Sequence, residues 1–215
     1  MTSPIASGRD ADVYALDDTR VLRRYRKGGD VTGEAEVMSH VGSLGYPVPQ
    51  IYAAGGADLV MDRVHGPTML EVVLAQQLSP IEAGEALAEL HNRLHALPPL
   101  RSREPGHTVL HLDLHPANVI LADDGPVVID WRNSTDGPPG FDCAVSAVII
   151  AQESVLSPTV AKPARHMLRA FTAGVRHPLA PHLTEALAYR AADPAQDPHE
   201  IAALDRARQL INAEL

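Results

Sequence analysis

Residues 111–131, HLDLHPANVILADDGPVVIDW, constrain the fold of this chain more than any other stretch. Short runs of Val, Ile and Leu alternate here with charged groups, among them Asp113 and Asp130. The runs predict two buried strands, at 118–122 and 126–131, joined by a tight Asp-Asp-Gly turn. An ionised carboxylate is costly to bury unless hydrogen bonds or a cation compensate it. The stretch therefore predicts a hairpin whose acids meet a charged partner.

The residues before this stretch predict a small β-sheet with one helix. Short β-rich runs at 12–17 and 20–26 indicate the two strands of a hairpin. Apolar residues recur with helical spacing through 31–44, and two more strand-like runs follow at 50–54 and 58–64. The order of strands, helix and strands predicts one helix packed on one sheet.

After residue 64 the pattern is mainly helical. Ser79, Pro80 and Glu82 form a capping-box pattern that predicts the start of a helix. Its apolar stripe should face the core, and consists of Ile81, Leu87, Leu90, Leu94 and Leu97. From Asp142 onwards the sequence predicts helices that are interrupted by Pro158, Pro178, Pro181 and Pro194.

These patterns together predict an α+β fold with two lobes and a cleft between them. Residues 1–64 form the β-rich N-terminal lobe of this prediction, and residues 65–215 form the helical C-terminal lobe.

Composition excludes several classes of protein. A net charge of −9 argues against a nucleic-acid binder, which usually presents a basic face. The single cysteine, Cys143, allows neither an internal disulfide nor a cysteine-rich zinc site. The N-terminus has no signal-peptide pattern, and the apolar runs are short for a membrane span. We therefore expect a cytoplasmic protein that binds neither membrane nor nucleic acid. The oligomeric state is open.

The polar residues of the opening stretch have the spacing of a phosphoryl-transfer loop. His111, Asp113 and Asn118 form the pattern His-x-Asp-x4-Asn, and Asp130 ends a later β-run. This is the spacing of the catalytic loop of protein kinases, where the Asp acts on the attacking hydroxyl and the Asn binds magnesium. Magnesium prefers a few carboxylate oxygens completed by phosphate oxygens and water. A dication and a triphosphate would thus be the charged partner of the acids.

The motifs "VLHLDLHPANVIL" and "PVVIDW" resemble the signature of the aminoglycoside phosphotransferase and choline-kinase-like family, which has a protein-kinase-like fold. The resemblance implies that Asp113 is the catalytic base and that Asn118 and Asp130 hold Mg²⁺. It also implies that His111 and Asp142 brace the catalytic loop.

The resemblance extends from about Gly8 to Asp142 and assigns nucleotide-binding residues upstream. "GRDADVY" resembles the short phosphate-covering turn of atypical kinases, which gives Gly8 and Val13 a place at the nucleotide. Arg23, on the strand face of Val21, stands where the family has a phosphate-pairing Lys. Arg can pair with phosphate and carboxylate, but its planar fork differs from the point charge of Lys.

Glu34 shares a helix face with apolar residues and is the predicted partner of Arg23. By the resemblance, Met61 would stand at the back of an adenine pocket. The backbone of Asp62 and Val64 would hydrogen-bond the base, and Gly66 would loosen the hinge.

The function implied is transfer of the γ-phosphoryl group of ATP, with Mg²⁺, to a hydroxyl of a small molecule. Asp136 and Glu153 are candidates for binding an acceptor that carries positive charge, such as an aminoglycoside. Two alternatives remain: a small atypical protein serine/threonine kinase, and a weakly active nucleotide-binding regulator.

A zinc or two-metal hydrolase is a further alternative. His111, Asp113 and His115 alternate, and on a strand they would share one face and could bind a metal. His91 and His95 have helical i, i+4 spacing but lack the Glu of a zinc-protease helix, and are expected to be ordinary helix residues near the surface.

Overall fold

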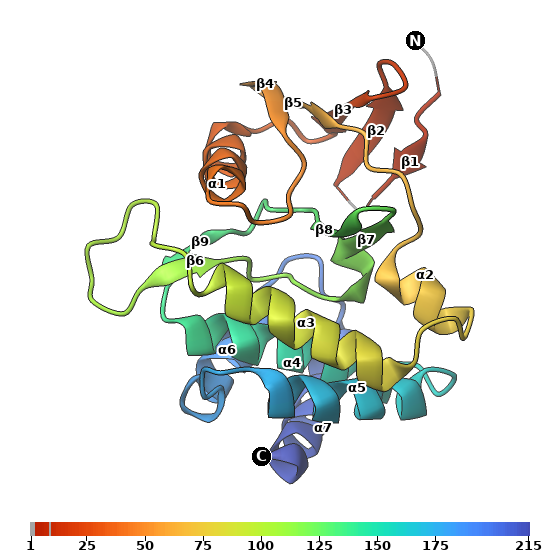
Figure 1. Cartoon of the computed structure of the whole chain (residues 1–215). Coiled ribbons are helices and arrows are strands. Elements are labelled where there is room, and N and C mark those ends of the chain that lie inside the picture. Colours follow the sequence, from red (N-terminus) through yellow and green to blue (C-terminus); the bar gives the residue numbers. More distant parts are fainter. Residues whose placement is uncertain (1–2, 9) are drawn as a thin grey trace.

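The N-terminal part of the chain is an antiparallel sheet with one helix against it, as the alternation of residues predicts. The computed structural model describes residues 3–8 and 10–215. The sheet has the order β1-β2-β3-β5-β4, and helix α1 (Thr32–Ser43) lies beside it (Figure 1). The strands are β1 (Ala6–Ser7), β2 (Ala11–Ala15), β3 (Arg20–Tyr25), β4 (Ile51–Gly55) and β5 (Asp58–Asp62). Arg9, in the predicted phosphate-covering turn, lies outside the described residues.

The register of this sheet decides which side chains face inward. Residues that pair directly across antiparallel strands share a face, as do residues two apart on one strand. Val13 and Leu59 both pair with Arg23, and Val21 pairs with Met61. Arg23 therefore lies on the same face as buried apolar residues, whereas its neighbour Arg24 points to the opposite, exposed face.

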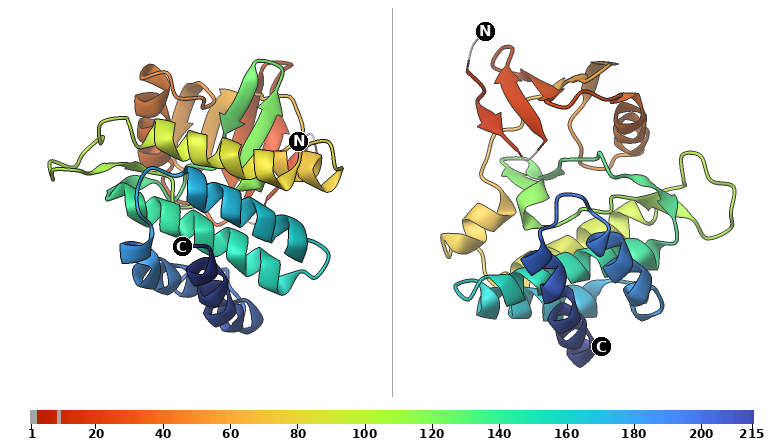
Figure 2. Two further views of the ribbon diagram at one scale, coloured as in Figure 1. Left: turned by 60° about the horizontal axis from the view of Figure 1, so that its bottom comes forward. Right: turned by 180° about the vertical axis from the view of Figure 1, so that it is seen from behind.

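The C-terminal part is a layered set of helices that carries two short hairpin-like sheets on the side facing the N-terminal sheet (Figures 1 and 2). One of these small sheets pairs β7 with β8, and the other pairs β6 with β9. The strands are β6 (Thr108–Leu110), β7 (Val119–Ala122), β8 (Gly125–Val128) and β9 (Thr135–Gly137). The helices are α2 (Met69–Leu74), α3 (Pro80–Leu94), α4 (Pro139–Leu156), α5 (Ala161–Gly174), α6 (Leu183–Ala191) and α7 (Pro198–Glu214), with short 3₁₀ helices η1 (Pro116–Asn118) and η2 (Ala180–His182).

The predicted hairpin at 118–131 is confirmed, with Asp123 and Asp124 in its turn. The predicted α+β architecture is likewise confirmed. The boundary predicted after Val64 falls in the connection between β5 and α2, and the division of the chain there stays a prediction.

Helix α3 begins as predicted, because Ser79 and Glu82 form a reciprocal capping box after which Pro80 opens the first turn. Leu87, Leu90 and Leu94 of its stripe are buried. The prediction for Ile81 is wrong: this residue is 51% exposed, because the buried face at the start of α3 is formed by the small residues Ala83 and Gly84.

The expectation that the histidines of α3 lie near the surface is also wrong. His91 and His95 are both buried. His91 donates a hydrogen bond from Nδ1 to the carbonyl of Leu87 at 2.8 Å and accepts one from Ser146 at 2.9 Å. A histidine can be buried when both ring nitrogens find partners, and its helical spacing alone does not reveal them.

Helix α4 is the central helix of the C-terminal part and packs against α5, α6 and α7. By length and composition it is apolar enough to cross a membrane, contrary to the expectation that the apolar runs are short for a span. Within the protein, 72% of this helix is buried, so its apolar character is accounted for by core packing.

Gly84 sets the closeness of α3 and α5. A Cβ on Gly84 would lie 2.4 Å from the carbonyl oxygen of Met167 and 2.9 Å from Cβ of Ala170. Gly33, in α1, has no atom within 4 Å of the position that a Cβ would occupy.

We expect Gly84→Ala to destabilise the protein by about 2 kcal/mol, because the methyl group forces the two helices apart. Gly33→Ala is the matched control and should stabilise the protein by up to about 1 kcal/mol, since alanine favours the helix. Urea denaturation of the three proteins measures both effects. Equal stability of the two variants would contradict this account of the α3–α5 contact.

Candidate active site

The loop that carries Asp113 is held by a buried carboxylate in the first turn of α4. Asp142 accepts hydrogen bonds from the backbone N–H of Leu112 at 2.7 Å, from that of His111 at 3.2 Å, and from Nε2 of His95 at 2.9 Å. Leu112 has a left-handed φ of +61°, which costs a residue with a side chain about 1–2 kcal/mol. Asp142 thus stabilises a strained turn that sets the direction of Asp113.

Asp142 is charged although it is fully buried. Burial raises the pKa of this carboxyl, but the hydrogen bond from His95 and the neighbouring histidines outweigh burial and hold the pKa below its usual value.

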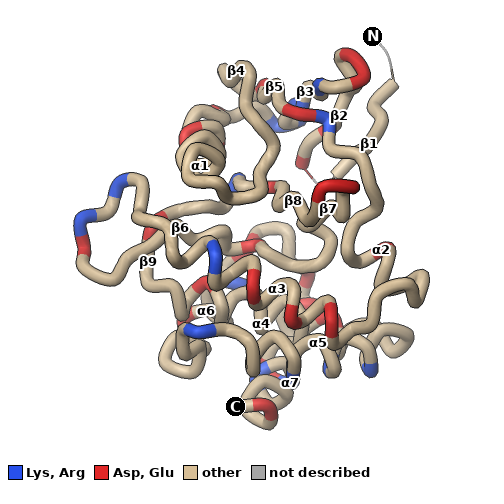
Figure 3. Tube along the Cα trace, in the orientation of Figure 1, with Lys and Arg blue, Asp and Glu red and all other residues tan. Residues whose placement is uncertain are grey.

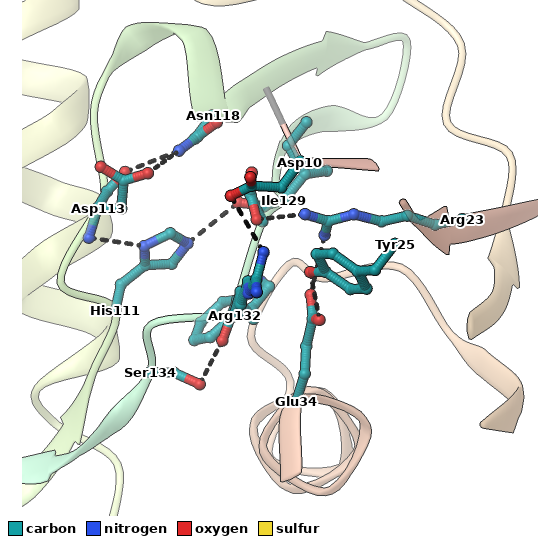
Figure 4. Close-up of polar contacts among 12 residues, drawn as sticks. Asp10, Arg23, Tyr25, Glu34, His111, Asp113, Asn118, Ile129, Arg132 and Ser134 are labelled. Atoms are coloured by element: carbon teal, nitrogen blue, oxygen red, sulfur yellow. Dashed lines mark hydrogen bonds and ion pairs between the residues drawn. The ribbon is translucent and has the colours of Figure 1, made fainter. Parts of the chain in front are cut away.

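His111 connects the same loop to the end of the β7–β8 hairpin. Its Nε2 donates to the carbonyl of Ile129 at 3.0 Å, and its Nδ1 accepts the backbone N–H of Asp113 at 3.2 Å (Figure 4). The ring also packs against Trp131, with 4.7 Å between ring centroids. Because both ring nitrogens are engaged, His111 has none left for a metal ion.

The hydrolase alternative needs several metal ligands in one place. Within residues 3–8 and 10–215, the structure contains no cluster of three or more His, Cys, Asp or Glu that could hold a metal ion.

Asp113 lies against Asn118 at the start of the hairpin. Nδ2 of Asn118 donates to the backbone carbonyl of Asp113 at 2.8 Å and to its Oδ2 at 3.2 Å (Figure 4). Burial, and next the negative charge of Asp130, raise the pKa of Asp113 to about 6. A carboxylate with this pKa is a stronger base than an exposed aspartate and is still mostly ionised at neutral pH.

A chain of charges joins the two parts of the molecule across the site. Arg23 donates from Nη1 to Oε1 of Glu34 at 2.9 Å and from Nη2 to Oδ1 of Asp130 at 2.5 Å. Tyr25 donates its hydroxyl to Oε2 of Glu34 at 2.8 Å, and the guanidinium of Arg23 lies over the Tyr25 ring (Figure 4). The predicted contact between Arg23 and Glu34 is therefore present, and Arg23 also binds Asp130.

Arg23 stays charged in this setting. Burial lowers its pKa, but the charges of Asp130 and Glu34 more than offset burial, and the pKa lies above its usual value. For Glu34, burial raises the pKa, and Arg23 and Tyr25 offset this only in part. Glu34 therefore depends on Arg23 to remain ionised.

The oxygen atoms of Asn118 and Asp130 suit a hard dication. Among the described residues, none donates a hydrogen bond to Oδ1 of Asn118 or to Oδ2 of Asp130. An amide oxygen and a carboxylate oxygen, completed by phosphate and water, form a donor set that magnesium accepts. Asp130 has a left-handed φ of +66°, a strained conformation for a residue with a side chain and one that is common at functional sites.

The residues predicted to contact a nucleotide lie on one face of the sheet. Val13, Val21, Arg23 and Met61 share the inner face through the β2–β3–β5 register. Gly8 forms the tight turn between β1 and β2, where its N–H donates to the carbonyl of Ala11 at 2.9 Å.

The backbone groups predicted to hydrogen-bond a base lie at the end of β5 and just after it. The N–H of Asp62 donates to the carbonyl of Gln50 at 3.0 Å, so this N–H is not free for a base. The N–H of Val64 has no acceptor among the described residues. Gly66 does not loosen this connection: a Cβ there would lie 2.3 Å from the carbonyl oxygen of Leu121, so Gly66 allows the chain to pack tightly on β7.

Asp136 and Glu153 are not brought together with Asp113. The carboxylate of Asp136 accepts the backbone N–H groups of Leu100, Arg101 and Ser102 at 2.6–3.0 Å, which ties down the loop before β6. Glu153 is exposed on α4, eleven residues beyond Asp142, which corresponds to about 16 Å along the helix.

Several residues of the site carry no signal in the sequence. Arg132, directly after Trp131, pairs with Asp10 at 3.0 Å and lies over the Tyr25 ring (Figure 4). His95 supports Asp142, and the charges of Arg190 and Asp193 act on Asp113. His95, Arg190 and Asp193 come from distant parts of the chain, and packing of α3, α4 and α6 assembles them, whereas Arg132 is next to the motif and meets Asp10 of the N-terminal part.

We expect Arg23→Ala to destabilise the protein by about 3 kcal/mol, because it leaves the buried carboxylate of Glu34 without its cation. Arg24→Ala is the matched control, since Arg24 pairs with Asp58 on the exposed face and should contribute less than about 1 kcal/mol. Chemical denaturation at neutral pH measures the two variants. A loss of similar size in both would show that the position of Arg23 between two carboxylates adds no stability.

The buried His91 predicts a loss of stability in mild acid. Burial lowers the pKa of His91 from 6.5 to about 4, and the negative charge of Asp142 offsets burial only in part. The unfolded chain therefore binds more protons than the folded protein below about pH 6.5. The free energy of unfolding consequently decreases as the pH is lowered. Between pH 7 and pH 5 this one group should account for about 2 kcal/mol.

His91→Gln tests this dependence, because glutamine does not titrate. The stability difference between wild type and His91→Gln should shrink as the pH falls from 7 to 5. His166→Gln, on the exposed face of α5, serves as the control and should leave the pH profile unchanged. A constant difference between wild type and His91→Gln would contradict the assignment.

Comparisons with known proteins concern the family and the fold of this chain. The model of the phosphotransferase enzyme family, APH, matches residues 2–108 and 75–182. No curated protein was found that matches the chain in sequence. Among solved structures, aminoglycoside phosphotransferase APH(4)-Ia has a TM-score of 0.61 at 14% identity, with 98% of this chain and 92% of that chain covered.

Two further structures share the fold. A choline/ethanolamine kinase family protein from Mesorhizobium loti has a TM-score of 0.61 at 16% identity, covering 95% of this chain and 86% of that chain. The amicoumacin kinase hAmiN, in complex with AMP-PNP and Ca²⁺, has a TM-score of 0.53 at 14% identity, covering 97% and 87%. At these low sequence identities the solved structures show only that the fold is shared, whereas the family model shows a similarity in sequence. The family model confirms the predicted family, and the solved structures share the predicted fold: the chain belongs to the phosphotransferase enzyme family, APH.

Proposed function

We propose that the protein transfers the γ-phosphoryl group of ATP, with Mg²⁺, to a hydroxyl group of a small molecule. The observation that carries the proposal is the arrangement of Asp113 against Asn118, next to an Asp130 that Arg23 connects to Glu34. This arrangement combines a base, two oxygen ligands for a dication and a cation for phosphate oxygens within one site.

Asp113 is the base of the proposed reaction. The acceptor oxygen forms a bond to the γ-phosphorus while the bond from that phosphorus to the bridging oxygen of ADP breaks, and the hydroxyl proton passes to the Asp113 carboxylate. Asn118 orients that carboxylate through Nδ2, and its own Oδ1 would be available to hold a dication together with Asp130. A bound dication supplies charge neutralisation for the phosphate oxygens.

Arg23 has a double role in the proposal. It holds Glu34 and Asp130 in place, and its cation lies where phosphate oxygens are expected. Two N–H groups of its fork are already committed to carboxylates, so a bound nucleotide shares Arg23 with Asp130. This sharing is the specific observation that favours the second candidate, a weakly active nucleotide-binding regulator.

The acceptor is not defined by the family, because one fold serves many acceptors. A cationic acceptor bound by Asp136 and Glu153 has no support from their positions, since one ties down a loop and the other is exposed far along α4. A cytoplasmic location, where ATP is available, remains part of the proposal.

Asp113 and Asp130 should affect different steps. We expect Asp113→Asn to lower turnover by about 10³-fold and to leave the Kd of magnesium-bound ATP within about threefold of wild type. Asp130→Asn should weaken ATP binding in the presence of Mg²⁺ and remove most of its magnesium dependence. Calorimetric titration with ATP, with and without Mg²⁺, and single-turnover measurements separate the two effects.

Wild-type protein that does not bind ATP with Mg²⁺ would overturn the proposed phosphotransfer. Binding without turnover on any small molecule or protein would favour the regulator instead. Phosphorylation of a protein but of no small molecule would favour the atypical protein kinase.

A further inference from the structure

A triphosphate needs positive charge, and this chain carries an excess of acid. Asp and Glu number 27 against 18 Lys and Arg, and over the described residues the Lys and Arg side chains are scattered along the chain (Figure 3). Among the residues labelled in Figure 4, Arg23 and Arg132 are the cations, and Arg23 already donates to two carboxylates. The binding of phosphate oxygens therefore depends on what Arg132 contacts.

Arg132 lies beside Arg23, two residues after Asp130. Its Cζ is 4.5 Å from the centroid of the Tyr25 ring, and Cζ of Arg23 is 4.9 Å from the same centroid. Arg23 in turn donates to Oδ1 of Asp130. The two guanidinium groups thus border one aromatic ring next to a proposed metal ligand, close enough for a single triphosphate to contact both.

The partner of Arg132 comes from the turn between β1 and β2. Nη1 of Arg132 donates to Oδ2 of Asp10 at 3.0 Å (Figure 4). Asp10 lies three residues before Val13, which pairs with Arg23 across β2 and β3. The contact therefore connects the turn that is predicted to cover the phosphates with the segment just after Asp130.

Asp10 holds Arg132 in the way that a phosphate oxygen would. Carboxylate and phosphate oxygens are alternative acceptors for the N–H groups of a guanidinium. Among the residues that the structure describes, none accepts a hydrogen bond from Nε or Nη2 of Arg132. The carboxylate of Asp10 would repel a triphosphate, because both are negatively charged. Asp10 and a nucleotide therefore compete for Arg132.

Arg132 is released from its carboxylate more easily than Arg23. The side chains of Arg23 and Glu34 are 11% and 4% exposed, so breaking their pair leaves charges without water. Those of Arg132 and Asp10 are 45% and 44% exposed, and an exposed ion pair contributes at most about 1 kcal/mol. Water can replace either partner at little cost, so Arg132 is the cation that a phosphate group can recruit.

We infer that Arg132 binds a phosphate group of the nucleotide, and that Asp10 occupies Arg132 until the nucleotide displaces it. The inference rests on the proposed function and adds to it a phosphate-binding residue and an internal anion that competes with the nucleotide. The exchange changes only ionic contacts: Arg132 passes from the Asp10 carboxylate to a phosphate oxygen, and the β1–β2 turn is released from the segment after Asp130.

Calorimetric titration of the full-length protein with ATP and Mg²⁺ tests the inference. Arg132→Gln should raise the Kd of ATP about tenfold, and Arg132→Lys should recover part of the loss. Asp10→Asn should lower the Kd of ATP about threefold, because it removes the competing charge. Both variants break the same ion pair, so a role in stability alone would change the two Kd values in the same direction.

Adenosine carries no phosphate, and its Kd should stay within about twofold of wild type in both variants. In the double variant Asp10→Asn/Arg132→Gln, the gain from Asp10→Asn should shrink, since there is no Arg132 to release. Arg169→Gln and Glu214→Gln are the matched controls: they break an ion pair of 2.8 Å between α5 and α7 and should leave the Kd of ATP unchanged.

The inference is overturned if Arg132→Gln binds ATP as tightly as wild type or more tightly, or if Asp10→Asn binds ATP no more tightly than wild type. Equal changes for adenosine and ATP also overturn it, because a phosphate contact does not act on adenosine. Wild-type binding distinguishes the failures. If wild type binds ATP with Mg²⁺, only the role of Arg132 is wrong, and if wild type does not bind ATP, the proposed function fails as well.

Discussion

Asp142 is the carboxylate on which the geometry of the site depends. It is fully buried at the start of α4, and it accepts hydrogen bonds from α3 and from two consecutive backbone N–H groups of the loop before Asp113. Those N–H groups belong to a turn with a left-handed leucine, which an isolated chain would avoid. A buried charge is expensive, but here three donors compensate it, and the network fixes one conformation of the loop. His95 is buried because it completes this network from α3, whereas His91 beside it is buried with Leu87 and Ser146 as its partners.

Arg23 connects the N-terminal and C-terminal parts of the molecule through its contacts with carboxylates. Its fork joins Glu34 of α1 to Asp130 at the end of the β7–β8 hairpin. Tyr25 donates a further hydrogen bond to the carboxylate of Glu34. A lysine carries one compact charge, whereas the planar fork of arginine reaches two carboxylates at once. Arg23 thus forms a bridge across the candidate site, from α1 and the sheet to the end of the hairpin.

The charges around Asp113 divide the site into two sides. Asp130 and Arg23 lie on the side of the sheet, where the register places the apolar residues Val13, Val21 and Met61 on the same face. Arg190, in the last turn of α6, and Asp193, just after this helix, act on the charge of Asp113 from the helical part of the chain. A reaction between a phosphate and a hydroxyl needs such a division, because the two reactants approach the base from different directions.

Local sequence determined the elements of this fold and the residues at its centre. Alternation predicted the strands, the capping box at Ser79 predicted the start of α3, and the spacing of Asp113, Asn118 and Asp130 predicted the residues of the candidate site. These signals are short-range, so they can be read without the structure.

Tertiary structure alone decided the rest. Whether Ile81 or His91 would be buried depended on which helix covered each turn of α3, and the spacing along one helix does not contain that information. Arg190, Asp193 and Arg132 stand far from the motif or carry no pattern, and packing between distant helices and strands brings them to it. The sequence determines which helix or strand each segment can form. The charged partners of a buried carboxylate are residues that are distant in the chain, because electrostatic and packing interactions act through space.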